Sequence, residues 1–311
     1  MNPFLKRLEQ ANRILVAGCG GGFDVFAGVP LAQHLWSSGK QVVFANYSFT
    51  DLSRCGGERL TPTMWRVDLE SRDLPYFPER WLGEWLLARG QPSPIYAFAK
   101  SGARQLIDAY RLIAERHEID LVVLVDGGTD SVLFGDEPGL GTVVEDAMSI
   151  VAACSAMNEK VLLATIGFGI DHYHGVSHYA FLENVARLIR GAGFLGAFSL
   201  VLNTPEAKAF VDLIDYANSR QPLHKSIVCN SIASALRGEF GDYHATDRTS
   251  GSELFINPLM TQYWTFEAPR IVQNMIYAPE LADTERIESA RMIIERWRDA
   301  SESRPRHQLP L

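Results

Sequence analysis

The sequence predicts an α/β fold in which a doubly wound, mainly parallel sheet carries helices on both faces. Short apolar runs alternate along the chain with longer segments of helical periodicity, which is typical of βαβ units. The short runs are apolar at successive positions, so both of their faces are expected to be buried, as in parallel sheets. The segments expected to form strands are 13–17, 41–45, 120–125, 160–165 and 197–202.

Helical segments separate these strands, and each connection is long enough for a right-handed crossover. Residues 1–300 are therefore predicted to form a single α/β domain. Residues 301–311 are polar and contain two prolines, so they are expected to be a flexible tail. The expected helices are 25–36, 103–116, 143–157, 177–190, 205–219, 225–237, 270–277 and 282–298.

Residues 51–101 depart from this alternation, because they are rich in proline and tryptophan. The prolines are at 62, 75, 78, 92 and 94, and the tryptophans are at 65, 81 and 85. We interpret this stretch as an inserted, cap-like segment. It would either cover a substrate or be a structural insertion without a role in binding.

Composition narrows the class of protein. The chain has 311 residues, with 29 Lys plus Arg against 37 Asp plus Glu, a formal net charge of −8. No basic face is visible, so no nucleic-acid partner is expected. There is no apolar signal core at the N-terminus and no apolar run of membrane-spanning length, so we expect a cytoplasmic protein without membrane contact. The four cysteines are widely spaced and are expected to be reduced thiols.

A glycine-rich loop, Gly18-Cys19-Gly20-Gly21-Gly22-Phe23-Asp24, follows the first strand. Glycines allow the backbone to approach a ligand, and N–H groups at a helix start attract anions. We therefore expect Gly20, Gly21, Gly22 and Asp24 to bind a ligand; the alternative is a tight structural turn. The loop is similar to the first motif of S-adenosylmethionine-dependent methyltransferases and to the NAD fingerprint. The second strand ends at Asn46, which is a candidate pocket residue. Dinucleotide-binding proteins carry an acid at this position, and that acid binds the ribose.

An acidic segment follows the third strand. Six acids and no Lys or Arg occur between positions 126 and 146. Carboxyl ends of parallel strands line the ligand crevice of a doubly wound sheet, so this segment should face the glycine loop. Its carboxylates suit Mg²⁺ or Ca²⁺, sugar hydroxyls, or general acid–base catalysis. The expected catalytic residues are Asp126 and Asp130, and the expected ligand-binding residues are Gly127, Gly128, Thr129, Ser131, Asp136 and Glu137.

Two alternatives apply to the acidic segment. Asp and Gly also populate ordinary turns, and Glu145 and Asp146 could favour the first turn of a helix through its dipole.

Histidines follow the fourth strand, where three of the eight in the chain fall within residues 172–178. We expect Asp171, His174 and His178 to take part in acid–base chemistry, with Asp171 orienting an imidazole ring. Surface histidines and a helix cap at Ser177 are the structural alternative. The spacing of these three histidines does not decide whether they bind a metal.

Two motifs support a family resemblance. Gly20-Gly21-Gly22-Phe23-Asp24-Val25 and the run DGGTDSVLFGDEPGLGT at 126–142 together resemble an uncharacterised bacterial and archaeal family, domain of unknown function 1152. The resemblance extends over roughly residues 10–300. It implies a Rossmann-like α/β fold and supplies no activity and no catalytic residue.

The leading hypothesis is a small-molecule enzyme. It would catalyse group transfer or hydrolysis on a nucleoside-, nucleotide- or sugar-like ligand at the carboxyl edge of the sheet. The cofactor is left open, with Mg²⁺ and Ca²⁺ as candidates. One alternative is an enzyme that uses S-adenosylmethionine or NAD. The other is a non-catalytic ligand-binding or assembly protein, in which aromatic residues at 81–85 and 263–266 form a homo-oligomer interface.

Overall fold

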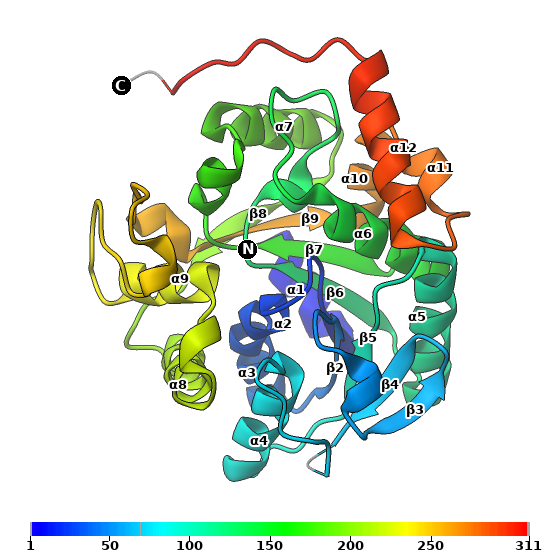
Figure 1. Cartoon of the computed structure of the whole chain (residues 1–311), viewed down its shortest axis with the longest axis vertical. Helices are drawn as coiled ribbons and strands as arrows, with labels where there is room; N and C mark the ends of the chain where they lie inside the picture. The colour runs from blue at the N-terminus through cyan, green and yellow to red at the C-terminus, as the bar shows by residue number, and fades with distance from the viewer. Residues whose placement is uncertain (1, 69, 310–311) are drawn as a thin grey trace.

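The computed structural model of the chain describes residues 2–68 and 70–309. Across these residues the strands form one nine-stranded sheet in the order β3-β4-β5-β2-β1-β6-β7-β9-β8 (Figure 1). Its centre is parallel, and helices alternate with the strands, so the predicted α/β, Rossmann-like fold is confirmed. The parallel strands are β1 (Arg13–Gly18), β2 (Gln41–Tyr47), β5 (Ile95–Phe98), β6 (Leu121–Asp126) and β7 (Val161–Thr165).

The central strands are buried on both faces, as their continuous apolar runs predict. Val16 of β1 pairs with Phe44 of β2 on one side and with Val123 of β6 on the other. None of these three side chains is accessible to solvent.

Antiparallel strands flank this centre on both sides. At one edge lie β3 (Glu58–Thr61) and β4 (Met64–Val67); at the other, β9 (Gln262–Glu267) pairs with both β7 and β8 (Phe194–Ser199). The strand expected at 197–202 is therefore displaced toward the N-terminus and reaches the parallel strands only through β9. Val201 and Leu202, which suggested the later boundary, are exposed.

Residues 51–101 extend the sheet, so the interpretation as a cap is wrong for most of this segment. They contribute β3, β4 and β5 together with α4 (Pro78–Ala88). Trp81 and Trp85 of α4 are buried, and their indole N–H groups donate to Gln221 and Asp212. The prolines lie in the connections and at the first turn of α4, where a missing N–H does no harm.

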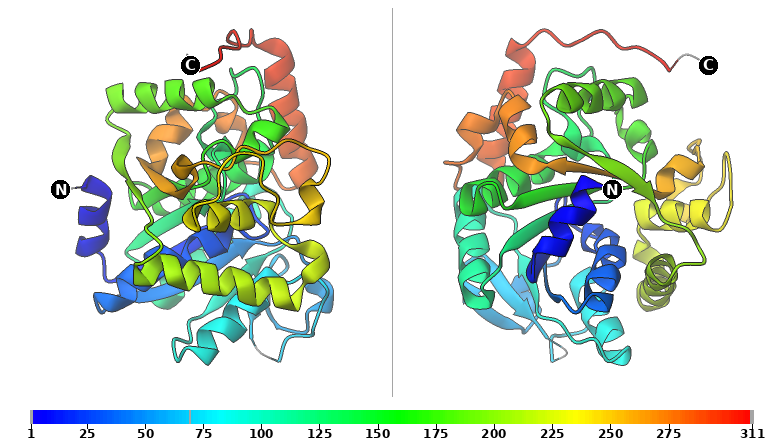
Figure 2. Two further views of the ribbon diagram at one scale, coloured as in Figure 1. Left: turned by 90° about the vertical axis from the view of Figure 1, so that its left-hand side faces the viewer. Right: turned by 180° about the vertical axis from the view of Figure 1, so that it is seen from behind.

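Helices cover both faces of the sheet (Figures 1 and 2). They pack against it in the two larger of the three apolar clusters found among the described residues. One face carries α5 (Ala103–His117), α6 (Val143–Met157), α7 (His178–Arg190), α10 (Ala268–Asn274), α11 (Ala278–Leu281) and α12 (Ile287–Ala300). The other carries α1 (Pro3–Gln10), α2 (Asp24–Ala27), α3 (Val29–Ser37), α4, α8 (Pro205–Arg220) and α9 (Ile227–Leu236).

The helix expected at 25–36 is interrupted between α2 and α3. Gly28 lies at the break, where an added Cβ would come within 2.3 Å of Val16 Cγ1 of β1. Close packing of this segment on the sheet therefore requires glycine at that position. Pro30 follows in the first turn of α3, a position that proline favours.

The C-terminal segment after α12 crosses back over α7 (Figure 1). It has no regular secondary structure, but Arg304 fixes it in place. The Arg304 backbone N–H donates to the Asp136 carbonyl, and its guanidinium forms ion pairs with Asp136, Glu137 and Glu183. The segment expected to be a flexible tail therefore contacts the domain through Arg304, while Pro310 and Leu311 lie outside the described residues.

Four of the five aromatic residues expected at an oligomer interface are buried in the core instead, and Trp264 is partly buried against it. Trp81, Trp85, Tyr263 and Phe266 are all at most 3% exposed. They cannot form such an interface without unfolding part of the domain. Across the residues that the structure describes, no helix combines the length and the apolar character needed to cross a membrane.

Candidate functional site

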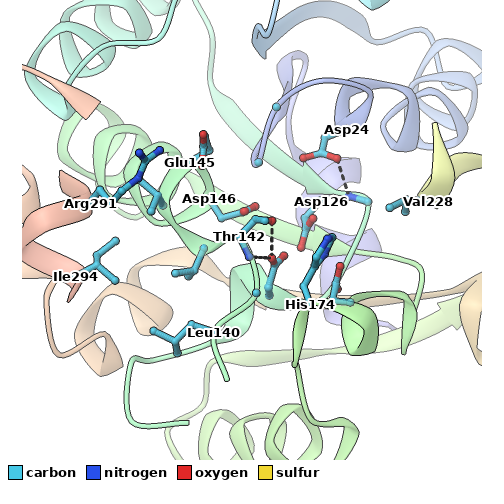
Figure 3. Close-up of a pocket in the computed structure, with 18 of the residues that line it drawn as sticks. Asp24, Asp126, Leu140, Thr142, Glu145, Asp146, His174, Val228, Arg291 and Ile294 are labelled. Atoms are coloured by element: carbon cyan, nitrogen blue, oxygen red, sulfur yellow. Dashed lines mark hydrogen bonds between the residues drawn. The ribbon is translucent and has the colours of Figure 1, made fainter. Parts of the chain in front are cut away.

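A cavity of about 640 Å³ lies at the carboxyl edge of the sheet, where the parallel strands end (Figure 3). Every one of the five parallel strands leads into a loop that contributes to it, as expected for a doubly wound sheet. The contributing residues are Asp24 after β1, Phe49 after β2, Lys100 after β5, Asp126 at the end of β6 and Asp130 after it, and Asp171 and His174 after β7.

Three carboxylates in this cavity converge on a common space. Asp24, Asp126 and Asp146 each offer an oxygen, and these atoms lie within 4.8 Å of one another. Asp126 and Asp146 are buried, and Asp24 is partly buried. Figure 3 shows the three side chains pointing toward one another from α2, the end of β6 and the first turn of α6.

Local hydrogen bonds orient two of these carboxylates. The Gly127 N–H donates to Asp24 Oδ1 at 3.4 Å, and the Ser131 hydroxyl donates to Asp126 Oδ2. One oxygen of each side chain is thereby engaged by the protein.

Asp146 differs from its neighbours because its Oδ1 is fully buried and has no hydrogen-bond partner within the described residues. Space is kept beside it by Gly20. A Cβ on Gly20 would lie 2.7 and 2.8 Å from the two Asp146 carboxylate oxygens and 2.9 Å from Asp24 Oδ2. Glycine at this position therefore preserves an opening of about one atom between two acidic side chains.

Asp130 and Asp171 lie beside these three residues and are held more firmly. Asp130 accepts two hydrogen bonds from Thr142, one from the backbone N–H at 2.8 Å and one from the side-chain hydroxyl at 3.0 Å. Asp171 accepts from the Thr129 N–H at 2.6 Å and its hydroxyl at 3.2 Å. We refer to Asp24, Asp126, Asp130, Asp146 and Asp171 as the carboxylate cluster.

Burial raises the pKa of every member of the carboxylate cluster, and repulsion from other members adds to this for all except Asp130. The Asp24 pKa is raised to about 7, although the backbone N–H groups of Gly127, Gly20 and Gly21 act in the opposite direction. Among residues 2–68 and 70–309, no lysine or arginine forms an ion pair with the cluster. Buried carboxylates without a counter-charge are costly, and a bound cation would offset that cost.

The glycine loop faces an acid of the protein itself. The Gly20 and Gly21 amides stabilise the ionised Asp24 side chain. The helix that begins there, α2, has only four residues. These features disfavour the expected binding of a ligand anion or dinucleotide phosphate at this loop.

Several predicted site residues lie at the cavity or support it. Gly20, Gly21, Asp24, Asp126, Gly127, Asp130, Asp171 and His174 line it directly. Thr129 and Ser131 hold Asp171 and Asp126 through their hydroxyls. A Cβ on Gly128 would lie 2.9 Å from Asp171 Oδ2, so this glycine leaves room for that carboxylate.

Four other predicted residues lie elsewhere. The Asn46 amide donates to the Gly22 carbonyl and to buried Glu79, behind the glycine loop. Asp136 and Glu137 hold Arg304 of the C-terminal segment. His178, at the start of α7, lines a separate apolar cavity with Phe168 and His172.

Four further residues line the cavity without being predicted from the sequence: Asp146, Lys100, Thr142 and Arg291. Asp146 lies within the acidic segment, but a first-turn acid is explained equally well by the helix dipole. Arg291 comes from α12, far along the chain, and nothing in its local pattern indicates the site.

The fold and the site together define a Rossmann-like α/β protein with a carboxylate-lined cavity at the carboxyl edge of its sheet. A family model described as "Protein of unknown function (DUF1152)" matches residues 59–304. The chain belongs to this family, which confirms the resemblance. The matched residues include the acidic run at 126–142 and begin after the glycine loop. No curated protein matches the chain.

Proposed function

We propose that Asp24, Asp126 and Asp146 bind a divalent cation, and that the protein is a cation-dependent enzyme acting on a small molecule by hydrolysis or group transfer. The observation that carries this proposal is the convergence of three carboxylates within 4.8 Å of one another. The unpartnered, buried Oδ1 of Asp146 supports it. A cation at this point would supply the missing counter-charge and electrostatic stabilisation for a reacting oxygen.

The ligand atoms favour a hard cation. Carboxylate oxygens suit Mg²⁺ and Ca²⁺, whereas softer metals favour thiolate or imidazole ligands. Three carboxylates fill only part of a six-coordinate shell. The remaining positions are then available to water and to hydroxyl or phosphate oxygens of the ligand.

Acid–base chemistry would come from the neighbours of these three residues. The carboxylates of Asp130 and Asp171 line the same cavity and are fixed by Thr142 and Thr129. His174 is exposed and also lines the cavity. Imidazole is a common proton-transfer group in catalysis. We assign proton transfer to Asp171 and His174, and positioning of ligand hydroxyls to Asp130.

Basic residues occupy another part of the cavity wall. Lys100 and Arg291 line it, and Figure 3 shows Arg291 on the opposite side from Val228. A divalent cation and two basic side chains in one cavity are suited to a phosphate-bearing ligand.

Cation binding is the first test. Protein freed of metal with a chelator is titrated with Mg²⁺, Ca²⁺ and Mn²⁺ in a calorimeter, alongside the variant Asp146→Asn. The wild type should bind at least one ion, and Asp146→Asn should lose that binding. Glu145→Gln is the matched control, because Glu145 lines the same cavity on the same helix but lies outside the convergent three.

Catalysis is tested with the cation that binds. Wild-type protein and Asp171→Asn are incubated with phosphate esters and ribonucleosides, and the products are followed by chromatography. Turnover should require the cation and fall in Asp171→Asn. Absence of cation binding in the wild type, or equal loss in Glu145→Gln, would overturn the assignment of the cation site. Ligand binding without turnover would identify a binding protein instead.

A further inference from the structure

A second cavity, of about 570 Å³, adjoins the carboxylate-lined one. The walls of the two cavities have six residues in common, so the cavities lie side by side. These shared residues are Gly21, Asp24, Phe49, Asp171, His174 and Val228. Both volumes lie in the range typical of small-molecule sites.

The second cavity has aromatic walls. The rings of Phe23 and Tyr76 meet edge to face at 5.6 Å, and those of Tyr76 and His224 at 6.2 Å. Phe49 and Tyr173 are 45% and 69% exposed, so part of their ring surface is available to a ligand. Such surfaces bind planar rings through stacking and edge contacts.

Hydrogen-bonding groups that the protein does not use lie among these rings. Within the described residues, neither the Tyr76 hydroxyl nor the His224 ring forms a hydrogen bond. By contrast, the hydroxyls of Ser226 and Ser252 are already engaged with the backbone. Tyr76 and His224 are therefore suited to the ring nitrogens and exocyclic groups of a heterocycle.

Charge argues against an anionic group in the second cavity. Asp24 and Asp171 form part of its wall, whereas Arg248 contributes a positive charge but is exposed and donates to the Lys225 carbonyl. A neutral planar group fits these surroundings better than a phosphate does.

We propose that the second cavity binds the heteroaromatic ring of a nucleoside-like ligand, whose hydroxyl-bearing part reaches the carboxylates of Asp126 and Asp130. The ring would lie against Tyr76 and His224, and the sugar would lie at the cation. This inference rests on the proposed function for the position of the sugar. It narrows the ligand classes to those in which a planar ring is joined to a polyhydroxylated part.

The test compares ligands that differ only in the ring. Wild-type protein with Mg²⁺ is titrated with adenosine, guanosine, cytidine, uridine and ribose. At least one nucleoside should bind roughly tenfold or more tightly than ribose, in keeping with the contribution of aromatic stacking. Tyr76→Ala and His224→Ala should each lower the affinity for that nucleoside. Neither variant should change the affinity for ribose or for Mg²⁺.

The control is Tyr243→Ala, an exposed aromatic residue that lines neither cavity. His224 is also exposed, so its variant keeps the test valid if Tyr76→Ala does not fold. The inference would be overturned if the protein bound Mg²⁺ but bound no nucleoside more tightly than ribose. It would also be overturned if Tyr243→Ala lowered nucleoside affinity as much as the other two variants do. Neither result would contradict the cation site. Nucleoside binding without any cation binding would support the aromatic site and overturn the proposed function.

Discussion

Gly20 is the residue whose identity is most directly tied to the cation site. Its φ lies outside the left-handed region, so alanine is conformationally acceptable there. The added Cβ would nevertheless fall between the Asp24 and Asp146 carboxylates. We expect Gly20→Ala to reduce Mg²⁺ affinity roughly 10–100-fold, the usual effect of disturbing the surroundings of a metal site. Calorimetric titration measures it.

The matched control is Gly83→Ala in α4, where the new Cβ would meet Ile95 Cδ1 at an ordinary 3.4 Å. Alanine is the better helix former, so this variant should fold and bind the cation like the wild type. Unchanged affinity in Gly20→Ala would show that the space between the two carboxylates is not where the cation binds.

Asp146 should also affect the thermal stability of the metal-free protein. Its buried oxygen lacks a partner, and its negative charge is repelled by Asp126, Asp130 and Asp24. Asp146→Asn removes that charge, so the metal-free variant should melt at a higher temperature than the metal-free wild type. The shift is about 2–4 °C per kcal/mol of relieved repulsion, and differential scanning calorimetry in chelator measures it. A lower melting temperature would indicate that Asp146 stabilises the fold.

At single residues, sequence reasoning succeeded where strand polarity determines position. Asp126 and Asp171 follow neighbouring parallel strands, so their meeting at one edge could be predicted. Positions could not be predicted where a side chain could equally well face the pocket or bind another part of the protein. Asn46 lies at the end of β2 but turns toward Glu79, a partner in a helix that the sequence pattern did not delimit.

Among the elements, the C-terminal segment has the clearest testable role. Arg304 is 18% exposed, and its partner Glu137 has a fully buried side chain. Arg304→Ala would leave that carboxylate without its positive partner, although the Phe134 and Gly135 N–H groups still donate to it. We expect a loss of about 3 kcal/mol in the free energy of unfolding, the usual effect of removing one partner of a buried pair.

Urea denaturation measures this loss. Arg306→Ala, two residues along the same segment, serves as the control, because Arg306 forms no ion pair in the part of the chain that the structure describes. Equal stability of the two variants would show that the ion pairs of Arg304 contribute nothing measurable.

Elements with strong periodicity could be predicted closely. The helix expected at 143–157 coincides with α6, and the one at 205–219 differs from α8 by one residue. The strand β5 was missed because it has only four residues between prolines and a glycine-containing helix start. Its place in the sheet depends on pairing with β2 and β4, which are distant in sequence.

For the whole molecule, the carboxylate cluster predicts how stability depends on pH. The Asp24 pKa is about 7 in the folded protein, above the ordinary value of about 4 for an unfolded chain. The folded state therefore holds more protons between these two values, and stability falls as pH rises through them. The other four members have raised pKa values and act in the same direction.

Metal-free protein should accordingly melt at a higher temperature at pH 5 than at pH 8. Comparison with Asp24→Asn isolates the contribution of Asp24, since the melting temperature of that variant should depend less on pH. Scanning fluorimetry in chelator at both pH values measures the difference. A wild type and variant with parallel pH profiles would contradict the raised pKa of Asp24.

The position of β9 between β7 and β8 also affects synthesis of the chain. Both of its neighbours precede it in sequence, and among the strands that the structure describes β8 pairs only with β9. Until residues 262–267 have left the ribosome, the edge of β7 stays open and β8 has no partner. Translation products that stop before this point would therefore expose unpaired strand edges, which promote aggregation. Completion of the sheet therefore has to wait for residues 262–267.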